Sequence, residues 1–424
     1  MRKTEFEPAS HIAEVTRRHA VAAGAAGAAA TILMPALARA ATPGPASGSV
    51  PVATGVRYQL IGQWDAAKLN TILKTKAPAF FGLPVAYTPA HSGVMLYRVT
   101  YPSVIPEQNN RAILASGLLA IPDDGGKSFP MLSYQHGTVY GRQEVPSFPE
   151  QSVETQLALA QFAGQGYVVI GADYFGMGLS DGAEGYLVKA SHQQATYDML
   201  MASRAILADM KIATPKLFLG GWSQGGFVTM AMLERLEQEG IAVDAAATAS
   251  APVDGFATMS GFLDFPRKID ATWVPTLFIL TAFSFENYYG VPGLARSLIN
   301  DDYYDISRRA YERQPYDAAD IPTDLHKLVR ADYFKPRYFA ASEYGRLITE
   351  KTNAYRWIIQ SRVRNYYGDA DEVITPGLGR LAMTYQRAIG GGNMVVDAIS
   401  TGKTTHRGTY ATAVPQWKLW FDQG

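Results

Sequence analysis

Residues 216–226 read KLFLGGWSQGG, and this stretch decides the fold that we expect for the chain. Its first five residues form a short apolar run that is typical of a buried strand, and Ser223 follows inside the pattern G-x-S-x-G. A helix-forming run begins at Gly225. A serine on a tight strand-to-helix turn stands clear of the sheet, and glycines beside it remove Cβ atoms that would clash in that turn. The stretch therefore predicts that Ser223 is a nucleophile.

A second copy of the same five-residue pattern stands at residues 178–182, which read GLSDG around Ser180. Residues 171–177 separate this copy from the preceding apolar run, and no helix-forming run follows it. The alternative for Ser223 is a helix N-cap after a glycine-rich turn, which explains the serine but not the glycines around it. Context therefore favours Ser223 over Ser180.

Short apolar runs alternate with helical stretches on both sides of this motif. Strands are predicted at residues 95–100, 112–121, 130–134, 167–171, 216–220, 245–251, 362–367 and 394–399. Helices are predicted at residues 153–162, 195–210, 225–239, 377–388 and 410–421. Such alternation is typical of an α/β protein whose sheet is mostly parallel and is covered by helices on both faces.

The alternation stops near Asp254. Residues 256–356 are polar, rich in tyrosine and interrupted by proline, and a structureless loop of that length is improbable in a compact domain. We expect a helical cap at 256–356, between core segments 41–255 and 357–424. The tyrosines indicate either an apolar or aromatic substrate group or packing within the cap.

The first forty residues have the character of an export signal. Arg17 and Arg18 precede an alanine-rich run at 20–38, and Ala38-Arg39-Ala40 is a small-x-small cleavage pattern. We expect a twin-arginine signal peptide at 1–40 and a periplasmic or extracellular protein, with a flexible start at 42–54. A membrane anchor is the alternative, but the run is short and interrupted by Pro35.

Composition excludes several classes of function. The chain of 424 residues has 38 Lys and Arg and 38 Asp and Glu, so charge offers no argument for a nucleic-acid or anionic-membrane partner. It has no cysteine, which excludes thiol catalysis, disulfides and thiolate metal sites.

A serine nucleophile needs a base, and His406 is the predicted one. It follows the last predicted strand, in a polar loop, as expected when the chain order is Ser, then Asp or Glu, then His. His136 and His192 are the other histidines in the core segments that remain as alternatives. A solvated loop histidine is the plain alternative for His406.

The acid that orients His406 is expected in the loop after residues 362–367. Asp371 is the first choice there, followed by Asp369 and then Glu372, and Asp254 after the preceding strand is a distant fourth. Asp369 and Asp371 could also form the carboxylate pair of a glycosidase, but that leaves the serine motif unexplained.

Two backbone N–H groups are expected to form the oxyanion hole. One is that of Gln224, directly after the nucleophile. The other is that of Thr138, in the loop 135–138 after a short strand, where Gly137 allows close approach and His136 shapes the loop.

Several of these stretches together resemble the α/β-hydrolase superfamily. They are YQHGT at 134–138, GADYFGMG at 171–178, GWSQG at 221–225, GDADE at 368–372 and His406. The resemblance runs from Gly93 to the C-terminus and looks most like secreted bacterial esterases and the secretory-lipase branch. It implies an α/β-hydrolase fold with a mostly parallel eight-stranded sheet, a helical cap before the acid-bearing strand, and Asp371 as the triad acid. The chain departs from the hormone-sensitive-lipase group by lacking HGGG, and from dehalogenases and epoxide hydrolases, which carry Asp in place of Ser223.

The expected function is hydrolysis of a small carboxylic ester by Ser223, His406 and Asp371, with no cofactor and no metal. The alternative is a peptidase or amidase with the same triad, which would need an acidic subsite for an amine. Carboxylates of the expected cap that could supply it are Glu286, Asp301 and Asp302. A binding protein that kept the fold without catalysis is a third, disfavoured possibility.

Overall fold

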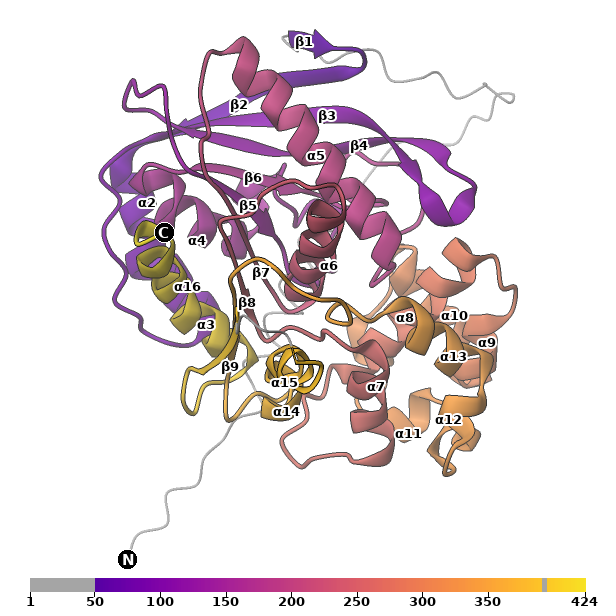
Figure 1. Cartoon of the computed structure of the whole chain (residues 1–424). Helices are drawn as coiled ribbons and strands as arrows, with labels where there is room; N and C mark the ends of the chain where they lie inside the picture. The colour runs from indigo at the N-terminus through magenta and orange to yellow at the C-terminus, as the bar shows by residue number, and fades with distance from the viewer. Residues whose placement is uncertain (1–49, 391–394) are drawn as a thin grey trace, which may run out of the picture.

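In the computed structural model, which describes residues 50–390 and 395–424, the chain is built around a sheet of ten strands (Figure 1). Their order is β1-β2-β3-β4-β6-β5-β7-β8-β9-β10. The six strands from β6 to β10 in this order are parallel, and β1 to β4 form an antiparallel arm that joins β6 through β4. The strands are β1 Val50–Ala53, β2 Val56–Trp64, β3 Val94–Ile105, β4 Arg111–Pro122, β5 Met131–Gln135, β6 Val168–Ala172, β7 Leu217–Trp222, β8 Ala245–Ala249, β9 Val363–Tyr367 and β10 Val396–Ser400.

All eight predicted strands are present, but the expected number is wrong because β1 and β2 extend the sheet. The start of the expected flexible segment 42–54 lies outside the described residues, whereas its end, β1, is paired with β2. β2 has the sequence VRYQLIGQW, in which polar residues fall on both faces of an outer strand that is only partly covered. Apolar and polar residues alternate from Val56 to Leu60, but the alternation breaks at the bulge between Leu60 and Gly62, and this short stretch was not recognised as a strand.

Helices of the core differ from the expected ones mainly at their ends. α5 begins six residues before the predicted start. The prediction missed residues 189–194 because they are polar and show no apolar period. The predicted helix 377–388 is divided at Arg380 into two short helices. The core helices are α2 Ala66–Thr71, α3 Ala77–Phe81, α4 Val153–Gln161, α5 Lys189–Asp209, α6 Gln224–Gln238, α14 Pro376–Gly379, α15 Leu381–Ala388 and α16 His406–Asp422.

Side chains of the central strands alternate between two hydrophobic layers, one on each face of the sheet. Along β7, Leu217 and Leu219 belong to the layer that contains α5 and α6, while Phe218 belongs to the layer that contains α4 and α16. Figure 1 shows α5 and α6 on one side of the strands and α4 and α16 on the other. The sheet is therefore buried on both faces, as the continuous apolar runs predict.

The fully described segment between β8 and β9 holds seven α-helices and no strand (Figure 1). They are α7 Gly255–Asp264, α8 Val274–Tyr289, α9 Leu294–Leu298, α10 Asp301–Tyr311, α11 Leu325–Leu328, α12 Tyr338–Ala341 and α13 Glu343–Lys351. Several of its tyrosines are buried in ring contacts inside the segment, such as Tyr311 stacked on Phe283. Packing therefore accounts for part of the tyrosine content. The domain boundaries at 255/256 and 356/357 remain predictions.

The expected signal peptide at 1–40 lies outside the described residues and remains a prediction. Within residues 50–390 and 395–424, no helix has both the length and the apolar character needed to cross a bilayer.

Candidate active site

Ser223 stands alone between the last residue of β7 and the first residue of α6. Its backbone has φ 53° and ψ −126°, a strained conformation that a side chain adopts only when its surroundings impose it. A Cβ at Gly221 would lie 2.4 Å from the carbonyl oxygen of Gly225, and a Cβ at Gly225 would lie 2.0 Å from that of Gln135. Glycine is thus required on both sides of this turn, which points the hydroxyl out of the sheet.

The Ser223 hydroxyl meets His406, the first residue of α16. His406 Nε2 lies 2.9 Å from Ser223 Oγ, and His406 Nδ1 lies 3.0 Å and 3.2 Å from the two carboxylate oxygens of Asp371. A carboxylate only accepts, so we assign the imidazole proton to Nδ1, and Nε2 then accepts from the serine. The exposed fractions are 9% for Ser223 and 2% for His406. The three predicted residues are therefore joined in one buried chain of hydrogen bonds.

Asp371 is held in its ionised form by its surroundings. Its side chain accepts from the Ser250 hydroxyl at 2.6 Å and from the backbone N–H groups of Val373 and Ile374 at 2.8 Å each. Burial would raise the pKa of Asp371, but the field and hydrogen bond of His406, with the bonds from Ser250 and Ile374, outweigh it and hold the pKa below its ordinary value. Asp371 is thus suited to stabilise an imidazolium at position 406.

The other predicted carboxylates are engaged elsewhere. Asp369 accepts from the Ser400 hydroxyl at 3.2 Å. Glu372 accepts from the backbone N–H of His406 at 2.9 Å, which fixes the start of α16 but leaves the imidazole to Asp371. Asp254 caps α7 and pairs with Arg356.

The alternatives to the nucleophile and base also have other partners. The Ser180 hydroxyl is fully buried and accepts from the backbone N–H of Gly176, and no histidine contact with it is found among the described residues. His136 is stacked on the ring of Tyr174 at 4.1 Å, and His192 makes a T-shaped contact with the same ring at 4.7 Å. Burial lowers the pKa of His136 to about 4 and that of His192 to about 3.

The two expected oxyanion donors lie on segments that touch each other. Gln224 is the first residue of α6, and the close approach of Gly225 to Gln135 and His136 brings the loop after β5 against the nucleophile turn. Neither the Gln224 nor the Thr138 N–H donates to another described residue. Both groups are therefore free to bind an oxyanion, and their role in catalysis stays a prediction.

Two tryptophans beside His406 were not identified from the sequence. Trp222 precedes the nucleophile, and its ring lies 5.4 Å from that of His406 and is stacked on Tyr410. Trp273 precedes α8 and lies 6.1 Å from the His406 ring on the cap side. The position next to the serine could have indicated Trp222. The sequence of the cap carries no signal for Trp273, because only tertiary packing brings it to the site.

The cap is tied to the loops that surround the site. The Tyr140 hydroxyl, in the loop after β5, lies 2.8 Å from the hydroxyl of Thr276 in α8. The Ser284 hydroxyl, also in α8, donates to the carbonyl of Glu184 and accepts from the N–H of Tyr186. Helix α8 is therefore hydrogen-bonded to the loops that lie at the carboxyl ends of the strands.

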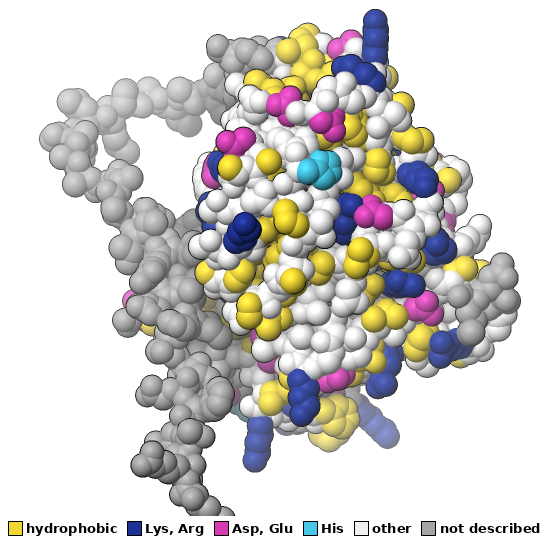
Figure 2. Space-filling view, turned by 90° about the vertical axis from the view of Figure 1, so that its left-hand side faces the viewer, with side chains coloured by type: hydrophobic (Ala, Val, Ile, Leu, Met, Phe, Trp, Pro, Cys, Tyr) yellow, Lys and Arg dark blue, Asp and Glu magenta, His cyan; other side chains and the backbone are white. Residues whose placement is uncertain are grey.

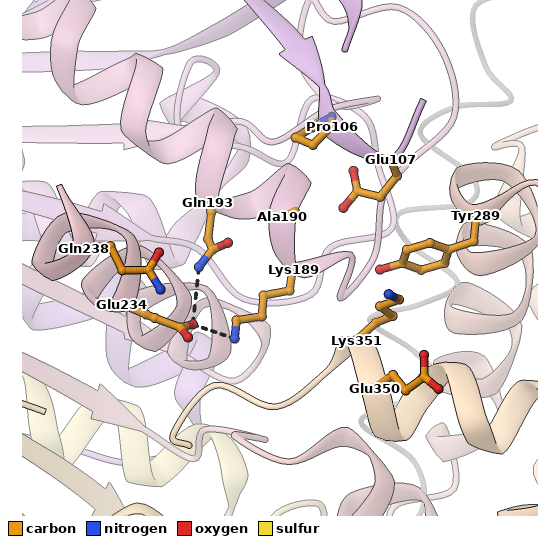
Figure 3. A pocket seen from close by; sticks show the side chains of 10 residues that line it. All are labelled: Pro106, Glu107, Lys189, Ala190, Gln193, Glu234, Gln238, Tyr289, Glu350 and Lys351. Atoms are coloured by element: carbon orange, nitrogen blue, oxygen red, sulfur yellow. Dashed lines mark hydrogen bonds and ion pairs between the residues drawn. The ribbon is translucent and has the colours of Figure 1, made fainter. Parts of the chain in front are cut away.

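A cavity of about 350 Å³ lies elsewhere, among β3–β4, α5, α6, α8 and α13 (Figure 3). None of its lining residues belongs to the triad or to the expected oxyanion hole. They are Pro106, Glu107, Lys189, Ala190, Gln193, Glu234, Gln238, Tyr289, Glu350 and Lys351. Within the described residues, no group of three or more His, Asp or Glu side chains could hold a metal ion.

Basic and acidic side chains are interspersed with apolar ones over the face shown in Figure 2. This face carries no large patch of one charge sign, in keeping with equal numbers of acidic and basic residues. The expectation of a small-molecule partner rather than nucleic acid or membrane stays a prediction.

Comparisons with known proteins agree with this architecture. The sequence model of a family described as serine aminopeptidase, S33, matches residues 145–319, a segment that contains Ser223 but neither Asp371 nor His406. No curated protein matches the chain.

Solved structures match nearly the whole chain. A putative hydrolase from Legionella pneumophila superposes with a TM-score of 0.76 at 22% identity over 86% of this chain and 96% of its own. The rice cell wall degrading esterase LipA from Xanthomonas oryzae gives 0.72 at 19% identity, over 89% and 98%. Candida antarctica lipase A in its closed state gives 0.59 at 14% identity, over 86% and 81%. The α/β-hydrolase fold expected from the sequence is thereby confirmed, with ten strands instead of eight.

Proposed function

We propose that this serine hydrolase of the α/β-hydrolase superfamily cleaves carboxylic esters through Ser223, His406 and Asp371. The observation that carries the proposal is the continuous chain of hydrogen bonds from the Ser223 hydroxyl through both nitrogens of His406 to Asp371. A hydroxyl in such a chain has a base for its proton, and the base has a fixed tautomer and a counter-charge.

The reaction proceeds in two acyl transfers. Ser223 Oγ attacks the ester carbonyl as its proton passes to His406 Nε2, and Asp371 stabilises the imidazolium that forms. The N–H groups of Gln224 and Thr138 bind the oxyanion. The imidazolium then protonates the leaving alcohol, which departs and leaves an acyl-enzyme. Water, deprotonated by His406, attacks this acyl-enzyme and releases the acid.

Two observations favour an ester over an amide substrate. Of the three cap carboxylates that could anchor an amine, Glu286 accepts from the N–H of Ala295 and Asp301 is paired with Arg296 and Arg330. The third, Asp302, is exposed in the first turn of α10. The solved structures with similar folds include proteins described as an esterase and a lipase. A peptidase or amidase is the second candidate, supported by the description of the family whose model matches residues 145–319.

The decisive assay compares two substrate series on the purified enzyme. We expect p-nitrophenyl esters of increasing acyl length to be cleaved, and aminoacyl-p-nitroanilides to be cleaved at least 10²-fold more slowly as judged by kcat/KM. Preference for the anilides would show that the enzyme is a peptidase or amidase and not an esterase. The acyl length with the highest kcat/KM separates a short-chain esterase from a lipase.

Export is also part of the proposal. A twin-arginine signal at residues 1–40 would deliver the enzyme to the periplasm or outside the cell. Replacement of both Arg17 and Arg18 by Lys in the full chain is expected to keep the enzyme and its activity in the cytoplasmic fraction of the host.

A further inference from the structure

Glu154 is a buried carboxyl group beside the triad to which the steps above assign no role. It is the second residue of α4 and is 4% exposed. Its Oε2 accepts hydrogen bonds from the backbone N–H of Gly137, at 3.2 Å, and from the indole N–H of Trp222. Gly137 is followed by Thr138. Trp222 precedes Ser223 and Gln224, whose backbone N–H is the other expected oxyanion donor. One carboxyl oxygen thus joins the two segments that form the oxyanion hole.

The carbonyl of Gly137 is fixed as well, by His136. Nδ1 of His136 lies 2.8 Å from this carbonyl oxygen, and its Nε2 lies 3.3 Å from the carbonyl oxygen of Asp173. Because burial lowers the pKa of His136, the ring is neutral, and we assign its single proton to Nδ1, which makes the shorter contact. In a trans peptide the carbonyl and the next N–H point in opposite directions. Fixing the Gly137 carbonyl toward His136 therefore fixes the direction of the Thr138 N–H.

The space around Gly137 leaves little freedom for this peptide. A Cβ at this residue would lie 2.9 Å and 3.0 Å from indole atoms of Trp222 and 3.1 Å from Oε2 of Glu154. Glu154 and Trp222 thus pack directly on the loop that they hold.

We propose that Glu154 is a positioning residue that sets the Thr138 N–H relative to the nucleophile turn by bonding Gly137 and Trp222 through one oxygen. This inference rests on the proposed function, because it assumes the oxyanion hole of Gln224 and Thr138. Oxyanion donors act through preorganisation, so a small displacement of one donor has a large effect on the rate of acyl transfer.

The role needs an acceptor oxygen and does not need a charge. Burial raises the pKa of Glu154 to about 7, although the bonds from Trp222 and Gly137 lower it. The groups that face it are the cation Arg407, the carboxylate Glu144 and the hydroxyls of Tyr134, Tyr174 and Tyr410. Its Oε1 has no hydrogen-bond partner within the described residues and can carry the proton while Oε2 continues to accept both bonds.

The test compares Glu154→Gln with Glu154→Leu, which have similar side-chain volumes. Gln offers one amide oxygen to both donors, whereas Leu leaves both without an acceptor. For a p-nitrophenyl ester we expect Glu154→Leu to lower kcat about 10²-fold with KM within about threefold of the wild type. Glu154→Gln is expected to retain kcat within about fivefold. A folded Leu variant with wild-type kcat, or a Gln variant as slow as the Leu variant, overturns the proposal.

Glu154→Asp covers the case in which the Leu variant fails to fold. It keeps the carboxyl group but withdraws it by one methylene, so we expect kcat to fall about tenfold or more, again with little change in KM. Wild-type kcat in this variant would equally overturn the proposal.

A second readout separates this inference from the ester assignment. A fluorophosphonate probe modifies Ser223 through a phosphorus centre whose oxygen occupies the oxyanion hole, whichever substrate the enzyme has. We expect the second-order labelling rate to rank wild type, Gln and Leu variants in the same order as kcat. If the wild type is labelled but cleaves no ester, the proposed function fails while this order still tests Glu154. Equal labelling of all three variants contradicts the role of Glu154 alone.

Discussion

The turns at 178–182 and 221–225 have the same five-residue pattern, but they differ in backbone conformation and in the direction of the serine side chain. At the second, Ser223 itself has positive φ, and its glycines are needed because backbone atoms approach them. At the first, the glycines have positive φ, at 59° and 91°, and Ser180 is turned inward. The five-residue pattern therefore fixes only the positions of the small residues. The flanking strand and helix determine which residue of the turn adopts positive φ.

Replacing each serine by alanine tests which of the two turns carries the nucleophile. We expect Ser223→Ala to lower kcat for a p-nitrophenyl ester by about 10⁴-fold or more, because no other hydroxyl lies within hydrogen-bond distance of His406 Nε2 in the described structure. Ser180→Ala is the matched control. It removes a buried acceptor for the N–H of Gly176 and should cost about 1 kcal/mol of stability, with kcat within a fewfold of the wild type. Loss of activity in the Ser180 variant alone would reverse the assignment.

The acid can be tested by the same kind of pair. Asp371→Asn should lower kcat by about 10³- to 10⁴-fold, because the amide favours the wrong tautomer of His406. Asp369→Asn changes a carboxylate two residues away that contacts only Ser400 in the described structure, and we expect nearly unchanged kcat. Steady-state kinetics of both variants decide the point. Equal losses would show that the loop, and not one carboxylate, supports the base.

The three residues that are joined by hydrogen bonds at the proposed site were predictable because each follows a strand in the chain order expected for this fold. Ser223 follows β7, Asp371 follows β9 and His406 follows β10, so local patterns locate all three. In the structure Asp371, and not Asp369, contacts the imidazole of His406. The exact start of α16 at His406 was not foreseen, since its N-cap Thr405 is one of several polar residues in that loop.

The residues that surround these three could not be found in this way. Glu154 lies in a helix whose residues are nearly all buried, so no apolar stripe distinguishes its inward side chain. Trp273 reaches His406 only because α8 folds over the sheet. Such contacts depend on the packing of distant segments, which periodicity and turn chemistry do not encode.

Glycines in the two turns also differ in how much stability the protein should lose when alanine replaces them. A Cβ at Gly225 would lie 2.0 Å from a backbone oxygen, so Gly225→Ala forces the nucleophile turn apart and should cost about 3 to 5 kcal/mol. At Gly182 the nearest atom to a new Cβ is a side-chain nitrogen at 3.7 Å, and only its φ of 91° opposes alanine, which should cost about 1 to 2 kcal/mol. Urea unfolding measures both free energies. A larger cost at Gly182 would mean that backbone strain, and not close approach, makes these glycines necessary.

A buried carboxyl group lies at each copy of the pattern, Glu154 at Trp222 and Asp173 at Gly178, and burial raises the pKa of both. The folded-state pKa of Glu154 is about 7, against an ordinary value of 4.5. The folded protein therefore keeps this proton where the unfolded chain has lost it. The resulting stability is full below pH 4.5 and is lost as the pH rises to 7, by at most about 3 kcal/mol.

Glu154→Gln removes this titration, because the amide does not ionise. The difference in unfolding free energy, wild type minus variant, should thus fall between pH 4.5 and pH 8, while the contributions of other groups cancel. Asp173→Asn should give a difference of the same sign, because burial raises that pKa too. Urea unfolding at several pH values provides the measurement. A difference that stays constant with pH would place the Glu154 pKa near its ordinary value, and Glu154 would then accept the bonds from Gly137 and Trp222 as a carboxylate at neutral pH.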